Sequence, residues 1–233
     1  MPETTQPARP LKGKLAMVTG ATRGLGLETA MALAEQGAHI IAVGRTVGAL
    51  EELDDNIRAI GGEATLVPID LMDEERVDVL GPSLYPRYDH LDILIGNAGY
   101  LGGLSPLTHV KTTEWTKTLS TNLTANFLLL RSLHPLLLRA DKALALFIGC
   151  TESPGETSAY WGPYNASKAA LKAMVECYQQ ETAETNIEVA FHTPPAMDTA
   201  LRRKAFPGGD VNALTPVEAA ANEIKDLVLK SIG

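Results

Sequence analysis

The sequence predicts an α/β protein with a doubly wound, mostly parallel sheet of about six strands. Short apolar segments of strand length alternate with longer segments in which apolar residues recur every three or four positions, a pattern typical of βαβ units. The short segments are continuously apolar, as expected for strands that helices cover on both faces. In this architecture ligands bind at the carboxyl ends of the strands.

The elements follow one another in strict alternation. The first strand, expected at 14–19, runs into a glycine-rich segment, and the helix after it ends at Gly37. Further strands are expected at 39–43, 64–69, 91–95, 143–148 and 187–191. Further helices are expected at about 50–60, 73–85, 112–139, 157–184 and 217–228. The apolar stripe of the helix at 112–139 comprises Trp115, Leu119, Leu123, Phe127, Leu130 and Leu137.

Length and composition indicate one globular domain. The chain has 233 residues, of which 45% are hydrophobic and 21% charged, and no second domain boundary is visible. Residues 1–11, with three prolines, are expected to form a flexible tail before a single domain at 12–233.

Net charge and the pattern of apolar residues limit the classes of partner that the sequence allows. A net charge of −8 argues against nucleic acid and anionic membranes as partners. Charged residues interrupt the most apolar segment, 126–150, so no membrane span is expected. The first residues form no apolar segment, and two cysteines make no disulfide or metal pattern, so we expect a cytoplasmic protein without a metal.

The first strand leads into the turn Thr19-Gly20-Ala21-Thr22-Arg23-Gly24-Leu25-Gly26. Glycines allow a tight turn and a close approach of the backbone to a pyrophosphate. The N-terminus of the next helix adds free N–H groups and a partial positive charge. We interpret the segment as a phosphate-binding turn, the alternative being a tight connection without a ligand.

Three separated motifs, TGATRGLG at 19–26, GNAG at 96–99 and YNASK at 164–168, resemble those of the short-chain dehydrogenase/reductase family. The resemblance extends from about residue 12 to about residue 199. It implies a Rossmann-like NAD(P)-binding catalytic domain, an oxidoreductase that moves a hydride between a nicotinamide cofactor and a carbonyl or alcohol substrate.

The residues after the second strand favour NADP(H) over NAD(H). A carboxylate there would bind a ribose 2′-hydroxyl and repel a 2′-phosphate, but none occurs before Glu51. Arg45 can pair with a phosphate, and Arg23 and Thr46 can support it, although each arginine could also be a solvated surface residue. The resemblance places the adenine beside Asp70, which could alternatively cap the helix near Asp73.

The resemblance also implies that small residues after the fourth strand let the cofactor cross the edge of the sheet. The residues expected to bind the cofactor are Gly20, Thr22, Arg23, Gly24, Leu25, Gly26, Arg45, Thr46, Asp70, Leu71, Asn97, Ala98, Gly99, Tyr164, Lys168, Pro194, Met197 and Thr199.

Tyr164 and Lys168 lie four residues apart, so a helix presents both on one face. A free phenol has a pKa of about 10, which is high for proton exchange at neutral pH. A neighbouring ammonium favours the phenolate and lowers that pKa. We therefore expect Tyr164 to be the general acid and base, with Lys168 tuning it and holding the cofactor.

The resemblance adds two further catalytic positions. A hydroxyl thirteen residues before the tyrosine is Thr151, where the family usually has serine, with Ser153 as a substitute if the loop shifts. Asn122 is expected to hold a water in a proton relay to Lys168, and Asn126 is the competing candidate.

Thr151 and Pro195, which stands where the family usually has glycine, motivate an alternative: a dinucleotide-binding regulatory or scaffold protein with little turnover. The run Arg202-Arg203-Lys204 either attracts an anionic substrate or forms a solvated face. The residues expected to wall the substrate pocket are Tyr100, Leu101, Leu104, Glu152, Tyr160, Trp161 and the loop 200–212.

We expect a homodimer that pairs the long helices at 112–139 and 157–184 across a twofold axis. Members of the family commonly continue into a seventh strand after the last helix, and the sequence shows none before Gly233. The interface that uses this strand is therefore expected to be absent.

Overall fold

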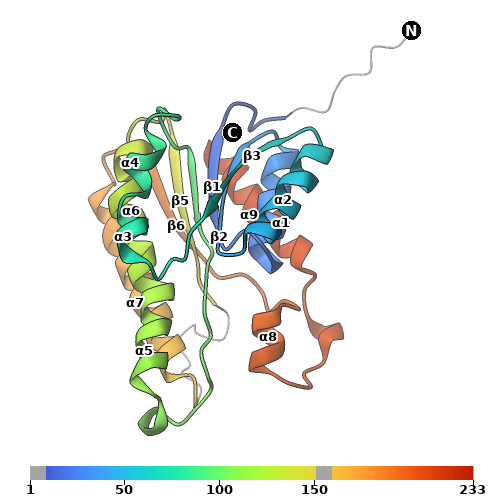
Figure 1. Cartoon of the computed structure of the whole chain (residues 1–233), viewed down its shortest axis with the longest axis vertical. Coiled ribbons are helices and arrows are strands. Elements are labelled where there is room, and N and C mark those ends of the chain that lie inside the picture. Colours follow the sequence, from blue (N-terminus) through green and yellow to red (C-terminus); the bar gives the residue numbers. More distant parts are fainter. Residues whose placement is uncertain (1–8, 151–158, 233) are drawn as a thin grey trace.

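The computed structural model describes residues 9–150 and 159–232, and within them one parallel six-stranded sheet forms the centre (Figure 1). The strand order is β3-β2-β1-β4-β5-β6, so the chain winds outward in both directions from β1. The strands are β1 Leu15–Thr19, β2 His39–Gly44, β3 Glu63–Pro68, β4 Ile93–Gly96, β5 Ala143–Ile148 and β6 Ile187–His192. The predicted doubly wound fold is confirmed.

Successive residues of each strand enter opposite layers of the core. In β1, Leu15 and Met17 join one apolar cluster, whereas Ala16 and Val18 join the other. Helices α1 (Gly24–Glu35), α2 (Val47–Ala59) and α9 (Val217–Ile232) cover one face of the sheet. Helices α3 (Glu74–Asp78), α4 (Leu80–Leu84), α6 (Ala125–Leu137) and α7 (Gly162–Glu181) cover the other. Helices α5 (Thr112–Leu119) and α8 (Ala200–Ala205) lie beyond the carboxyl ends of the strands (Figure 1).

The helix predicted at 112–139 is not continuous. A π-helical turn at Ser120–Thr124 separates α5 from α6, and the Asn126 side chain donates to the Asn122 carbonyl across it (2.8 Å). The turn shifts the phase of the helix, and the predicted stripe is wrong at two positions. Trp115 is 36% exposed and Phe127 is 46% exposed, while Asn122 is fully buried.

Two other predicted helices have different bounds. The segment 73–85 forms α3 and α4, with the break at Val79. Pro82 has no N–H to donate to the Asp78 carbonyl, which instead accepts from the Ser132 hydroxyl (2.7 Å). The helix predicted at 157–184 is α7, which begins at Gly162 with a proline in its first turn.

The packed domain begins earlier than predicted. Leu11 is fully buried, and the Arg9 guanidinium donates to the carbonyls of Ile60 and Gly61 at the end of α2. Residues 9–11 therefore belong to the domain and not to a flexible tail. Within residues 9–150 and 159–232, no helix is both long and apolar enough to cross a membrane.

Candidate active site

A cleft of about 690 Å³ opens at the carboxyl ends of the strands. It collects segments far apart in the sequence: the glycine turn after β1, the ends of β2 and β4, the start of α7 and the segment after β6. All residues predicted to bind the cofactor line this one cleft: Gly20, Thr22, Arg23, Gly24, Leu25, Gly26, Arg45, Thr46, Asp70, Leu71, Asn97, Ala98, Gly99, Tyr164, Lys168, Pro194, Met197 and Thr199.

The glycine turn is tightly packed at Gly20 and Gly26, where a Cβ atom would crowd its neighbours. Gly20 and Gly24 have φ angles of +64° and +53°, a region that glycine adopts without strain. Gly26 lies against the turn, and a Cβ there would be 2.2 Å from the carbonyl oxygen of Gly20. The turn therefore exposes backbone at the N-terminus of α1, where N–H groups are available to an anion.

Asn97 joins the glycine turn to the end of β4. Its Nδ2 donates to the Thr19 carbonyl (2.9 Å), and its backbone N–H donates to the Thr19 hydroxyl (3.0 Å). The same hydroxyl accepts from Ala98 N–H (3.1 Å) and donates to the Ile95 carbonyl (3.2 Å). These bonds hold the floor of the cleft at the switch point between β1 and β4.

Arg45 and Asp70 stand together at the end of the cleft beyond β2 and β3. The Arg45 guanidinium lies 3.8 Å from the Asp70 carboxylate, and both side chains are exposed. Asp70 also accepts from Met72 N–H (3.0 Å), whereas Asp73 caps α3 by accepting from Arg76 N–H (3.2 Å). The alternative role of Asp70 as that helix cap is therefore wrong.

Thr199 connects the segment after β6 to the glycine turn. Its hydroxyl caps α8 by accepting from Arg202 N–H (3.2 Å), and its methyl group is 3.5 Å from the Cβ position of Gly24. Pro195 and Ala196 line the cleft beside it. This contact brings α8 over the cleft.

Tyr164 and Lys168 occupy one face of α7, as predicted from their spacing, and both are buried. The Lys168 amine lies 6.0 Å from the centre of the Tyr164 ring and donates to the Ile148 carbonyl at the end of β5 (2.8 Å). Trp161 packs edge-on against Tyr164, with ring centres 5.8 Å apart. The phenol ring and the amine are therefore held by packing inside the cleft.

Burial lowers the pKa of Lys168 from 10.5 to about 8, and a nearby Cys150 thiolate would partly oppose this shift. A lysine with a pKa of about 8 still carries most of its charge at neutral pH. It also exchanges protons readily in the range where a catalytic acid and base must work.

Asn122 lies in the π-helical turn and uses its carboxamide to hold neighbouring segments. Its Nδ2 donates to the Tyr100 carbonyl (3.0 Å) and the Ser167 hydroxyl (2.9 Å), and its Oδ1 accepts from Tyr100 N–H (2.7 Å). Its Oδ1 and the Lys168 amine lie 3.8 and 4.0 Å from the Cβ position of Gly99. Asn122 and Lys168 therefore meet at the same glycine, with Asn126 one turn further on.

The substrate-side walls were predicted only in part. Tyr100, Leu101 and Trp161 line the cleft, but Leu104 and Tyr160 do not and are exposed. Thr151, Ser153 and Glu152 lie outside the described residues. Two lining residues of α5 and its π turn, Lys117 and Thr121, were missed, because the π turn changes which side chains of this helix share a face.

Comparison with known proteins places the chain in a family. The model of short chain dehydrogenases matches residues 14–209. The chain belongs to the short-chain dehydrogenase family. It is an oxidoreductase by that membership, and the resemblance inferred from the three motifs is confirmed.

Individual relatives match this chain over most of their own length. The oxidoreductase YciK of Escherichia coli K12 is 32% identical over 213 residues, which cover 89% of this chain and 83% of YciK. A short chain dehydrogenase from Shigella flexneri, solved in complex with NADP, is 30% identical with a TM-score of 0.88 and covers 97% of this chain and 93% of its own. A short chain dehydrogenase from Escherichia coli CFT073, solved in complex with NADPH, is 30% identical with a TM-score of 0.86. The match covers 97% of this chain and 94% of the other.

Proposed function

We propose that this oxidoreductase uses NADP(H) to interconvert a small-molecule carbonyl and its alcohol. One observation carries the proposal: Tyr164 and Lys168 are buried in the same cleft that the glycine turn of β1 opens onto. The residues at the two ends of this cleft, the glycine turn and Tyr164, would hold the phosphate and nicotinamide ends of a bound dinucleotide. The NADP and NADPH complexes of the two similar dehydrogenases support this choice of cofactor.

The residues present fit a phosphorylated dinucleotide. The backbone at Gly20 and Gly26 leaves no room for side chains, and it meets the first turn of α1, where a pyrophosphate is favoured. Arg45 and Arg23 line the same cleft as exposed cations and can bind a ribose 2′-phosphate. Among the described residues, no group of three His, Cys, Asp or Glu side chains could hold a metal ion.

A bound nicotinamide cofactor would supply the hydride-transfer chemistry of the reaction. Tyr164 donates its hydroxyl proton to the carbonyl oxygen during reduction and takes it back during oxidation. Lys168 stabilises the phenolate with its charge, and the Ile148 carbonyl holds the amine in place. The Thr151 hydroxyl is proposed to polarise the substrate oxygen, as the family resemblance implies.

Asn122 is proposed to support Lys168. Its three hydrogen bonds fix the segment after β4 and the adjacent turn of α7, so it positions the floor of the cleft beside the amine. The proton relay through a water held by Asn122 stays a prediction. We further propose a cytoplasmic homodimer that pairs through α5, α6 and α7.

The proposal is tested by measuring the transfer of deuterium from the cofactor to a carbonyl compound. The protein is incubated with NADPH deuterated at C4 and a panel of aldehydes and ketones, and the alcohols are analysed for deuterium on the carbinol carbon. We expect transfer from one face of the nicotinamide, with NADPH used in preference to NADH. Tight NADPH binding without transfer to any carbonyl compound would instead favour the regulatory alternative.

A further inference from the structure

Six cationic side chains line the cleft, and the proposed reaction uses only three of them. Arg23 and Arg45 are assigned to the cofactor phosphate, and Lys168 acts on Tyr164. The remaining cations are Lys117, Arg202 and Lys204. The only carboxylate among the described lining residues is Asp70, which is beside Arg45. This concentration of positive charge is unexpected in a chain with a net charge of −8.

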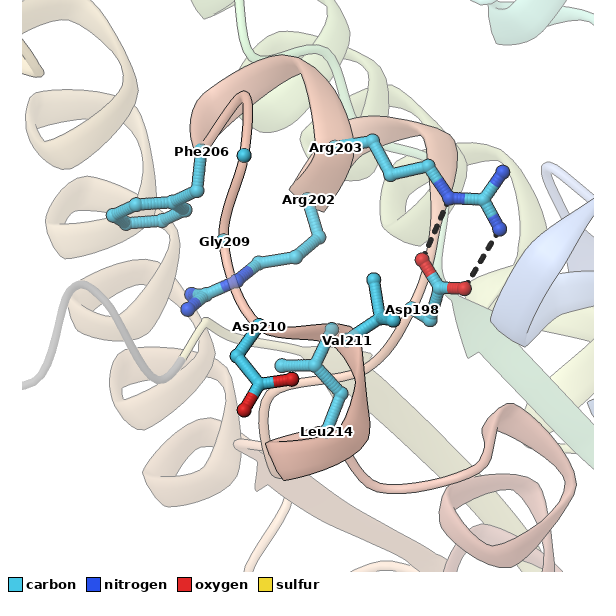
Figure 2. Close-up of a pocket in the computed structure, with 9 residues that line it drawn as sticks. Asp198, Arg202, Arg203, Phe206, Gly209, Asp210, Val211 and Leu214 are labelled. Atoms are coloured by element: carbon cyan, nitrogen blue, oxygen red, sulfur yellow. Dashed lines mark hydrogen bonds and ion pairs between the residues drawn. The ribbon is translucent and has the colours of Figure 1, made fainter.

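The structure separates the three cations of the run 202–204. Arg203 points away from the large cleft and forms a two-point ion pair with Asp198 at 2.7 Å for both contacts. Figure 2 shows this pair on one side of α8 and Arg202 extending to the other, beside Phe206. Arg202 and Lys204 line the large cleft, where they can attract an anionic substrate. Arg203 instead belongs to the solvated face, so the two interpretations of this run apply to different residues.

Lys117 and Lys204 both line the cleft and both lie beside the Tyr100 ring. Lys117 belongs to α5 and Lys204 to α8, and their amines lie 4.5 and 5.6 Å from the centre of the Tyr100 ring. Neither amine has a carboxylate within 4.0 Å among the described residues. The nearest acid on α5, Glu114, accepts from the Tyr100 hydroxyl at 3.0 Å and does not line the cleft.

The wall next to Tyr164 has a different character. Leu101, Trp161, Tyr164 and Ala205 form a buried apolar cluster, and Leu201 and Phe206 pack against it. The reacting end of a substrate at Tyr164 therefore meets aromatic and aliphatic side chains, while Lys117 of α5 and Lys204 of α8 add ammonium groups to the lining of the same cleft.

We infer that the substrate is a carbonyl compound or alcohol with an apolar body and an anionic oxyacid group, a carboxylate or a phosphate, which Lys117 and Lys204 bind. This inference rests on the proposed function of the same cleft. Two ammonium groups on separate elements can bind one oxyanion from both sides, and charge-assisted hydrogen bonds are the strong class of such contacts. The apolar wall then directs the uncharged carbonyl end toward Tyr164.

The test compares aldehydes that share a benzaldehyde body and carry either an anionic or a neutral group at the para position. We would measure kcat/KM with NADPH for 4-carboxybenzaldehyde, 4-formylphenyl phosphate and the neutral methyl 4-formylbenzoate. The wild-type protein should prefer at least one anionic aldehyde to the ester by about tenfold, and the better anion identifies the oxyacid. Lys117→Gln and Lys204→Gln should each reduce that preference about fivefold by raising KM, with the ester unaffected. Lys172→Gln removes an exposed lysine of α7 and should change nothing.

Calorimetric binding of the same three aldehydes to the NADPH complex separates this inference from the proposed function. Tighter binding of an anion that is lost in Lys204→Gln supports the inference even if no aldehyde is reduced, which would contradict the proposed function. The inference is overturned if the ester binds as well as both anions. It is also overturned if the two variants weaken NADPH binding instead, because the lysines would then belong to the cofactor.

Discussion

Lys168 is the residue at which burial and charge conflict most strongly. The residue is 4% exposed, and among the described residues its amine has one hydrogen bond, to the Ile148 carbonyl, so its charged form is poorly solvated. Proteins retain such groups at functional sites more often than in ordinary cores. The Tyr164 ring beside it supplies a reason to keep the charge there.

This conflict makes the stability of the cofactor-free protein depend on pH. The pKa of Lys168 is about 8 in the folded protein and 10.5 in the unfolded chain. Below pH 8 both states hold the proton, and the charge costs the fold about 3 kcal/mol. Between pH 8 and 10.5 the unfolded chain binds more protons, so the free energy of unfolding rises with pH. Lys168→Met should therefore be stabilised relative to wild type at pH 7, and this advantage should shrink by about 3 kcal/mol by pH 10.5.

Urea unfolding at a series of pH values measures this difference. Taking the difference between variant and wild type cancels the titrating groups that do not interact with Lys168. Lys172→Met, at an exposed site on the same helix, should show a difference that is constant with pH. A constant difference for Lys168→Met as well would contradict the assigned pKa.

The glycine turn is an element whose sequence follows directly from its packing. Gly26→Ala places a methyl group on the Gly20 carbonyl, so the turn must move, and we expect a loss of about 2 kcal/mol in stability together with weaker NADPH binding. Gly48 in α2 has open space at its Cβ position. Gly48→Ala should stabilise the protein by about 0.5 kcal/mol and leave NADPH binding unchanged. Thermal unfolding and NADPH fluorescence titration of both variants check the pair, and equal effects would contradict this account of the turn.

The elements also show where prediction from sequence succeeds. Strands such as β5 have continuous apolar segments with clear ends, and the structure reproduces 143–148 without change. The tight glycine turn and the i, i+4 pair on α7 are local patterns, so their residues reach the cleft as expected. The π turn at 120–124 was not predicted, because its stabilising contact from Asn126 to the Asn122 carbonyl is set by the buried environment rather than by periodicity.

Packing between segments far apart in the chain could not be predicted from the sequence either. Leu11 follows a proline and looks like part of a tail, yet it enters the core beside α1 and β2. The placement of Lys117 and Lys204 beside the same Tyr100 ring depends on where the fold puts α5 and α8, which no local pattern encodes.

At the scale of the whole molecule, two large side chains on α5 and α6 remain exposed. Trp115 and Phe127 face solvent, and Arg131 stacks over the Phe127 ring at 5.2 Å. If these helices pair across a twofold axis, the protein should have about twice the 24.9 kDa mass of one chain. Phe127→Glu should shift it to the monomer mass, because the charge would be buried without a partner.

Light scattering after gel filtration measures both masses. Leu227→Glu, at an exposed position of α9 on the opposite face of the sheet, is the control and should remain dimeric. A wild-type protein that elutes as a monomer would contradict the predicted pairing, without affecting the chemistry of the cleft.

The most direct test of the account is the single-turnover rate of NADPH oxidation by Tyr164→Phe with a reducible aldehyde. Removing the hydroxyl leaves the ring packing on Trp161 intact, so NADPH should bind as in wild type. The rate should fall by 10²–10⁴, the usual contribution of a general acid. Tyr85→Phe, remote from the cleft, should retain the wild-type rate. Oxidation by Tyr164→Phe within twofold of wild type would show that another group supplies the proton.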